Sequence, residues 1–161
     1  MCSRETILEY QRGPNFYDVR QDRNYTLELS ESTAVSGTSD GLSPLIVFKE
    51  RRPPVLSRTA IETYRESDPE LHEKFLRWLN EEHSGTLGEA ASKTIRDAVR
   101  TTSLPTLFPK VVQTLDGSWN TLTIRRGDNF IRLGWYTLPQ EYAGIEALIK
   151  LISDTISRDR R

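Results

Sequence analysis

The sequence has few of the residues that most often build cross-linked and catalytic sites. It contains a single cysteine, Cys2, and two histidines, His72 and His83. One cysteine cannot form a disulfide within the chain, which is typical of a reducing compartment, so we expect a cytoplasmic protein. The alternative is a lipoprotein anchored through Cys2, if a signal peptide has been removed from its precursor.

The sequence also lacks an excess of positive or negative charge and has no long apolar run. The 22 lysines and arginines nearly balance the 23 aspartates and glutamates, which gives a net charge of -1. Because affinity for nucleic acid depends largely on clustered cations, we expect no nucleic-acid partner. No stretch approaches the roughly 20 apolar residues of a membrane-spanning helix, so no membrane span is predicted. Phosphate-loop, zinc and dinucleotide motifs are missing as well, and we expect no cofactor and no metal.

Both histidines fall in a segment that is predicted to be one helix, residues 67–83. At 1.5 Å per residue they would be separated by roughly 16 Å, too far to bind the same metal ion. Each is flanked by glutamate, as on a solvated helix face. Glu9 and Glu28 belong to an acidic group near the N-terminal strands, but none of that group lies in an apolar setting typical of catalytic carboxylate pairs. We therefore assign no catalytic residue, and an enzyme is not favoured.

Alternation of apolar and polar residues predicts strands near the N-terminus. Leu8 and Tyr10 share one face of the first strand, and Tyr25, Leu27 and Leu29 share one face of a later one. A short apolar run at 45–48 predicts a further buried strand. Between them, the small polar residues of 32–44 predict a flexible loop.

Two helices are predicted within an insert of about residues 67–103. Ser67 or Asp68 can cap the first helix and Pro69 suits its first turn, whereas Pro105 follows the second and cannot continue it. A C-terminal helix has one broad apolar face, and the last residues, 158–161, are predicted to fray. The residues of that face are Tyr142, Ile145, Leu148, Ile149, Ile152 and Ile156.

The residues 119–136 predict a β-hairpin whose register follows from its turn. With a two-residue turn at 127–128, Ile124 faces Ile131 and Leu122 faces Leu133, so the aliphatic side chains share one side. The fold class is therefore α+β: one domain over 1–161, with a single antiparallel sheet, the C-terminal helix packed across its aliphatic face, and two inserted helices.

The other side of the hairpin combines large aromatic rings with forked cationic donors, which are enriched at binding hot spots. Two interpretations are open. The inserted helices could cover this side, leaving ordinary cross-strand pairs, or the side could be an exposed recognition surface for a protein partner. Its residues are Trp119, Arg125, Phe130, Arg132 and Tyr136.

The ends of the chain share an order of features with one known family. The N-terminal sequence ILEYQRGPNFYDVRQDRNYTLEL, then Asp116, the strand at 121–124, Pro139 and the aliphatic residues of 145–152 resemble the emfourin-type bacterial inhibitors of thermolysin-like metalloproteases. The similarity covers about 70 residues, and GPNFYDV stands where that family has a glycine-rich loop. It implies that partner contact begins at Asn15, Phe16 and Tyr17.

Taken together, these features predict a non-catalytic protein-interaction domain. The resemblance makes a protease the expected partner and the protein a relative of metalloprotease inhibitors. The alternative is a small hydrolase or ligand-binding domain, whose site would be a concave pocket with converging polar groups rather than a protruding loop or flat aromatic patch. The oligomeric state stays open.

Overall fold

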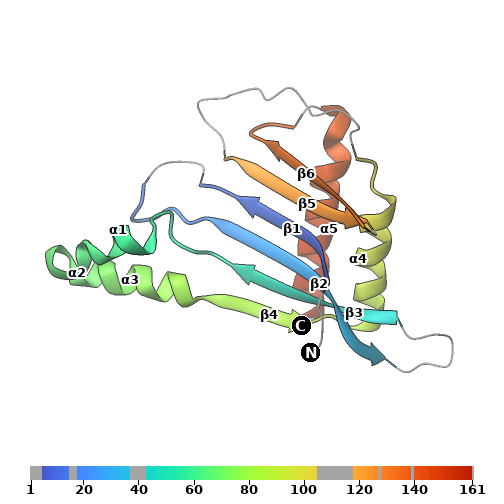
Figure 1. Cartoon of the computed structure of the whole chain (residues 1–161), viewed down its shortest axis with the longest axis horizontal. Helices are drawn as coiled ribbons and strands as arrows, with labels where there is room; N and C mark the ends of the chain where they lie inside the picture. The colour runs from blue at the N-terminus through green and yellow to red at the C-terminus, as the bar shows by residue number, and fades with distance from the viewer. Residues whose placement is uncertain are drawn as a thin grey trace.

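Six strands form one antiparallel sheet in the computed structural model of the chain (Figure 1). The structure describes residues 5–14, 18–36, 43–104, 118–126, 128–138 and 140–160. The elements in chain order are β1 (Glu5–Arg12), β2 (Tyr25–Ser36), β3 (Ser43–Arg51), α1 (Arg58–Glu62), α2 (Tyr64–Ser67), α3 (Pro69–Asn80), β4 (Glu82–Thr86), α4 (Glu89–Thr101), β5 (Asn120–Arg126), β6 (Asn129–Trp135), the 3-10 turn η1 (Gln140–Tyr142) and α5 (Ala143–Asp159).

The strand order across the sheet is β4-β3-β2-β1-β5-β6. The first strand of the chain therefore lies in the interior of the sheet, between β2 and the late hairpin β5–β6. Leu8 pairs with Leu29 on one side and with Ile124 on the other. The predicted α+β fold with a single antiparallel sheet is confirmed.

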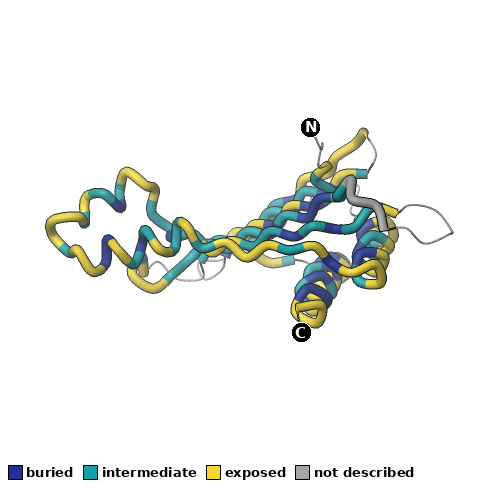
Figure 2. Tube along the Cα trace, turned by 90° about the horizontal axis from the view of Figure 1, so that it is seen from below, coloured by how far each residue is buried: buried dark blue, intermediate teal, exposed yellow. Residues whose placement is uncertain are grey.

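The main hydrophobic core lies between one face of the sheet and the helices α4 and α5 (Figure 2). Leu8, Leu29 and Leu122 point into it from the strands, and α5 contributes Ile145, Leu148, Ile152 and Ile156. These are the period-two and helical stripes that the sequence predicts. The packing of the C-terminal helix across the aliphatic face of the sheet is therefore confirmed, and α4 lies beside it on the same face.

The helices α1 to α3 (residues 58–80, called the arm below) extend beyond one end of the sheet (Figures 1 and 2). They have a small core of their own, in which Ile61 and Phe75 are fully buried and Leu71 nearly so. The arm is held to the loop before β2: Lys74 Nζ donates to the Arg20 carbonyl at 2.7 Å, and the Arg23 guanidinium stacks on the Trp78 ring at 4.7 Å.

Two predicted boundaries are wrong because strand pairing extends into the predicted loop and insert. Val35 pairs with Pro44, so the strands take up most of 32–44, and residues 37–42 lie outside the described part of the chain. The helix predicted over 67–83 ends at Asn80, and β4 follows it as an edge strand. Phe48 pairs with Gly85 there, and a Cβ at Gly85 would lie 3.0 Å from the Phe48 ring, so the strand needs a glycine where the ring packs.

Within the segment predicted to fray, residues 158–161, Asp159 and Arg160 contact the rest of the fold, while Arg161 lies outside the described residues. Asp159 Oδ2 accepts a hydrogen bond from the Gly88 N–H at 3.1 Å, at the N-terminus of α4. Arg160 bonds to the Glu50 carboxylate at 2.6 Å and stacks on Phe48 at 4.7 Å. The end of α5 is therefore fastened both to α4 and to the sheet.

Candidate functional site

The hairpin β5–β6 has the register predicted from its sequence. Ile124 pairs with Ile131 and Leu122 with Leu133, and Arg125 pairs with Phe130 on the alternate positions. Leu122, Ile124 and Leu133 are buried in the main core. Because successive side chains of a strand point to opposite faces, Phe130 and Arg132 are placed on the face away from α4 and α5. Arg125 also alternates with the buried residues of β5, but it lines a cavity beside α4 at the end of the strand.

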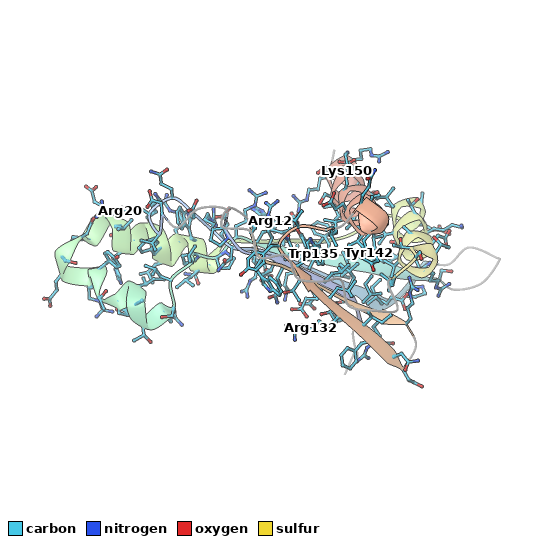
Figure 3. The ribbon with its side chains drawn as sticks, turned by 90° about the horizontal axis from the view of Figure 1, so that it is seen from above. Arg12, Arg20, Arg132, Trp135, Tyr142 and Lys150 are labelled. Carbon is cyan, nitrogen blue, oxygen red and sulfur yellow. The ribbon has the colours of Figure 1, made fainter. Side chains whose placement is uncertain are left out.

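We call the five residues Trp119, Arg125, Phe130, Arg132 and Tyr136 the hairpin face. Phe130 is 68% exposed and Trp119 42% exposed, which is unusual for aromatic side chains of this size. Both arginines are exposed as well, and Tyr136 is half-buried. Figure 3 shows Arg132 on the side of the hairpin away from α5, whereas Trp135 and Tyr142 lie on the helix side.

The interpretation that inserted helices cover the hairpin face is wrong for the part of the chain that the structure describes. Of the inserted helices, α4 packs into the main core on the opposite face of the sheet, and the arm lies beyond the end of the sheet (Figure 1). The helices go there because α4 has its own apolar stripe, with Ile95 and Val99 buried against the sheet, and the arm buries its apolar side chains internally.

Trp119 is held in one orientation on this face. Its ring meets that of Tyr136 edge to face, with the centroids 4.8 Å apart and the planes at 65°. It also lies over Gly134, where a side chain would collide with the indole. A tryptophan fixed in this way loses little conformational freedom on binding, which favours a partner contact.

Beside Phe130 the sheet surface is hollowed into a small cavity of about 200 Å³. Its lining is polar apart from the phenyl ring, and one pair is already hydrogen-bonded, since Gln11 Nε2 donates to Glu9 Oε1 at 2.7 Å. The groove gives the flat aromatic face a neighbouring recess with both donors and acceptors. The lining residues are Glu9, Gln11, Thr121, Thr123, Phe130 and Arg132.

Asn15, Phe16 and Tyr17 lie outside the described residues, so their predicted role in partner contact stays a prediction. The chain just before them is fixed next to the hairpin face. The Gly13 N–H donates to the Trp119 carbonyl at 2.8 Å, and a Cβ at Gly13 would be 3.7 Å from that oxygen. The described chain at Gly13 is therefore tied to the backbone of Trp119, a residue of the hairpin face.

The histidines do not share a helix, contrary to the prediction. His72 is buried in α3, where Nε2 lies 3.6 Å from Glu62 Oε2, and His83 is exposed on β4, 3.4 Å from Glu81. A hydrogen bond from Arg23 lowers the pKa of the Glu81 carboxyl. Within the described ranges, no three side chains of His, Cys, Asp or Glu come together as metal ligands.

Sequence reasoning missed a second site, at the far end of α4. A cavity of about 360 Å³ lies between α4, the start of β1 and the end of β5. Four arginines and two glutamates line it, together with Ile7 and Val99. Arg96 and Arg100 are one helical turn apart, and Arg125 and Arg126 are adjacent in β5. This spacing of arginines was the sequence pattern that could have predicted the site. The charged residues are Arg96, Arg100, Arg125, Arg126, Glu5 and Glu31.

Comparison with known proteins found no matching family model, curated protein or solved structure. Among the described residues, no helix has the length and apolar character needed to cross a membrane. The described residues therefore offer two candidate sites: the hairpin face, and the arginine-lined cavity beside α4.

Proposed function

We propose that the protein is a non-catalytic protein-interaction domain that binds a protein partner through the hairpin face. The observation that supports this most directly is the exposure of Phe130, at 68%, and Trp119, at 42%, on a sheet face opposite the helices of the core. Exposed apolar side chains that gather on one surface mark interaction sites, whereas single ones need no explanation. The single cysteine supports a cytoplasmic setting for this function.

The chemistry of the hairpin face is that of a binding hot spot. Tryptophan, tyrosine and arginine are the residues whose removal most often weakens protein interfaces, and all three types occur here within two strands. Arg125 already makes an exposed ion pair with Glu5 at 3.2 Å, whereas Arg132 stands at the groove beside Phe130. Arg132 can therefore offer its guanidinium to a carboxylate or carbonyl of the partner without losing a strong internal contact.

A narrower proposal concerns the identity of the partner. The resemblance to emfourin-type inhibitors makes it a thermolysin-like metalloprotease, contacted by Asn15, Phe16 and Tyr17 and by the hairpin face. The hydrogen bond from Gly13 to Trp119 supports a joint surface, because it ties a residue two positions before Asn15 to the backbone of Trp119.

A pull-down tests the broader proposal. Wild type, Trp119→Ala and Arg132→Ala are compared with Arg77→Ala, which removes an exposed arginine of α3 in the arm. We expect the two hairpin variants to lose a partner that wild type and Arg77→Ala retain, since a hot-spot truncation costs about 2 kcal/mol or more. Equal recovery by all four proteins, each checked by circular dichroism, would contradict the proposal.

An inhibition assay tests the narrower proposal that the partner is a thermolysin-like metalloprotease. Wild type is titrated into a thermolysin-like metalloprotease, and hydrolysis of a peptide substrate is followed. Inhibition that is weakened by Trp119→Ala supports a protease partner. Absence of inhibition removes the protease from the proposal while the pull-down still decides whether another protein binds the same face.

The alternative function, a ligand-binding domain, is favoured by one observation. The arginine-lined cavity is concave and has converging polar groups, and its volume of about 360 Å³ is within the range of small-molecule sites.

A further inference from the structure

The arginine-lined cavity gathers more positive than negative charge. Its lining contains four guanidinium groups and two carboxylates, which leaves an excess of two positive charges. Like charges around one hollow repel each other, and the repulsion is strongest where the groups are shielded from water. An anion placed among them would remove that repulsion.

Two of the arginines are held in place by the two carboxylates. Arg96 Nε lies 3.2 Å from Glu31 Oε1, and the same guanidinium donates to the Pro44 carbonyl. Arg125 pairs with Glu5 at 3.2 Å. The Arg96 pair is largely buried and holds its guanidinium beside the hollow, whereas the Arg125 pair is exposed and holds its side chain only weakly. Neither pair neutralises Arg100 or Arg126.

Arg126 is the one of the four arginines that the structure shows with a buried donor lacking a partner. One terminal nitrogen donates to the carbonyls of Val99 and Thr102, at 2.8 and 2.6 Å, and so closes the C-terminus of α4. Its Nε is buried and has no hydrogen-bond partner among the described residues. Buried donors are nearly always paired in folded proteins, so this unpaired guanidinium nitrogen marks a local shortage of acceptors beside the cavity.

The remaining lining is apolar and comes from an irregularity in β1. The register of β1 against β2 shifts between Thr6 and Leu8, which inserts Ile7 as an extra residue. Such bulges redirect a side chain, and Ile7 lines the cavity together with Val99 of α4. The ligand would therefore have a carbon skeleton as well as charge.

We propose that this cavity binds a small organic dianion, such as a phosphate monoester or a dicarboxylate. Guanidinium groups bind both oxyanions through paired, parallel hydrogen bonds, and two negative charges match the excess of the lining. At about 360 Å³ the cavity is larger than a single inorganic ion requires. Arg100 and Arg126 lie outside the hairpin face, whereas Arg125 belongs to both surfaces, so Arg100→Gln is the variant that tests the cavity separately from the proposed partner interaction.

Calorimetric titration of the whole chain tests the proposal, at constant ionic strength so that general screening does not change. The probes are inorganic phosphate, pyrophosphate and succinate, with acetate as the monoanion. We expect saturable binding of at least one dianion, at least about tenfold tighter than acetate. The phosphate and succinate arms distinguish the two chemical sources of the charge.

Variants locate the site. Arg100→Gln and Arg125→Gln should each weaken binding about tenfold, as expected for the loss of one charge-assisted hydrogen bond. Arg77→Gln, at an exposed position of α3 in the arm, is the matched control and should bind like wild type. Each variant is first shown to be folded by circular dichroism.

Three outcomes would overturn the proposal: no saturable binding of any dianion, equal affinity for acetate and succinate, or binding that neither Arg100→Gln nor Arg125→Gln weakens.

Discussion

The indole of Trp119 lies over the backbone of Gly134, where a Cβ atom would be 2.4 Å from the indole Cζ2. Gly134 pairs with Thr121 across the hairpin, one step before the pairing of Asn120 with Trp135. The absence of a side chain at Gly134 lets the indole reach across β6 to Tyr136. The glycine thereby sets the orientation in which Trp119 would meet a partner.

Gly134→Ala is expected to displace the Trp119 ring. The indole is partly exposed and can turn outward, so we expect a loss of only about 1 kcal/mol in the free energy of unfolding, from the broken aromatic pair. Near-ultraviolet circular dichroism and tryptophan fluorescence should both change, and partner binding should weaken as in Trp119→Ala.

Gly144→Ala is the control for that variant. Nothing lies within 4 Å of a Cβ at Gly144, which is at the start of α5. Alanine should leave the aromatic signals unchanged and raise stability by up to about 1 kcal/mol, because it favours the helix over the unfolded chain. An unchanged near-ultraviolet spectrum in Gly134→Ala would show that Trp119 is not held as described.

Asp159→Ala should destabilise the protein by about 1 kcal/mol, measured by urea unfolding. The Asp159 carboxylate accepts from the Gly88 N–H at the N-terminus of α4, where the N-cap glycine offers no side chain of its own. Loss of an N-cap acceptor typically has this effect. Asp154→Ala, in the same helix, removes only an exposed pair with Lys150 and should cost less. Equal losses in the two variants would contradict the capping role.

Stability is expected to fall at alkaline pH, in part through Tyr25. Burial and the hydrogen bond to Glu50 raise the pKa of the Tyr25 hydroxyl above its ordinary value. The folded state therefore keeps this proton where the unfolded chain, with a pKa of about 10, releases it. The stabilisation is fully present below about pH 10 and is lost as pH rises through the folded pKa.

Tyr25→Phe isolates that contribution. The variant should lose about 1 kcal/mol at neutral pH, because the hydroxyl that donates to Glu50 is gone. Its urea midpoint should then fall less steeply than that of wild type between about pH 9 and pH 11. Parallel profiles for the two proteins would show that Tyr25 titrates alike in the folded and unfolded states.

The arm should unfold separately from the sheet. Phe75→Ala removes the fully buried ring of the arm core, a change that typically costs about 3–5 kcal/mol. We expect faster hydrogen exchange in α1 to α3 and unchanged protection in β1, β2 and β5. Ile152→Ala, in the main core, should instead raise exchange throughout the sheet. Global loss of protection in Phe75→Ala would show that arm and sheet unfold as one unit.

Local patterns in the sequence predict most of the sheet. The register of β5 and β6 follows from the turn and from Ile124, Ile131, Leu122 and Leu133, because a slip of one residue would turn the aliphatic side chains to the wrong face. The strand β4 could not be predicted, because its sequence EHSGT does not alternate between apolar and polar residues. Gly85 marks the strand only through the ring of Phe48, a contact set by tertiary packing.

The two candidate surfaces differ in how much of each can be predicted from the sequence. The hairpin face can be assembled from one hairpin, but its exposure depends on where α4 and the arm pack. The arginine-lined cavity needs the end of α4 to meet the end of β5, which Arg126 secures by bonding to the carbonyls of Val99 and Thr102. A tertiary contact between the ends of a helix and a distant strand cannot be predicted from a local sequence pattern.

The interior position of β1 in the sheet has a consequence for synthesis of the chain. Tyr10 hydrogen-bonds to Asn120, a residue 110 positions later, and β1 pairs with β5 over the same distance. A ribosome adds roughly 5–20 residues per second, so the edge of β1 that pairs with β5 stays unpaired for on the order of ten seconds until β5 has been synthesised. An unpaired strand edge with apolar neighbours invites association with other chains. The nascent protein is therefore most prone to aggregation during that interval. The interval ends when the hairpin β5–β6 is synthesised and pairs with β1.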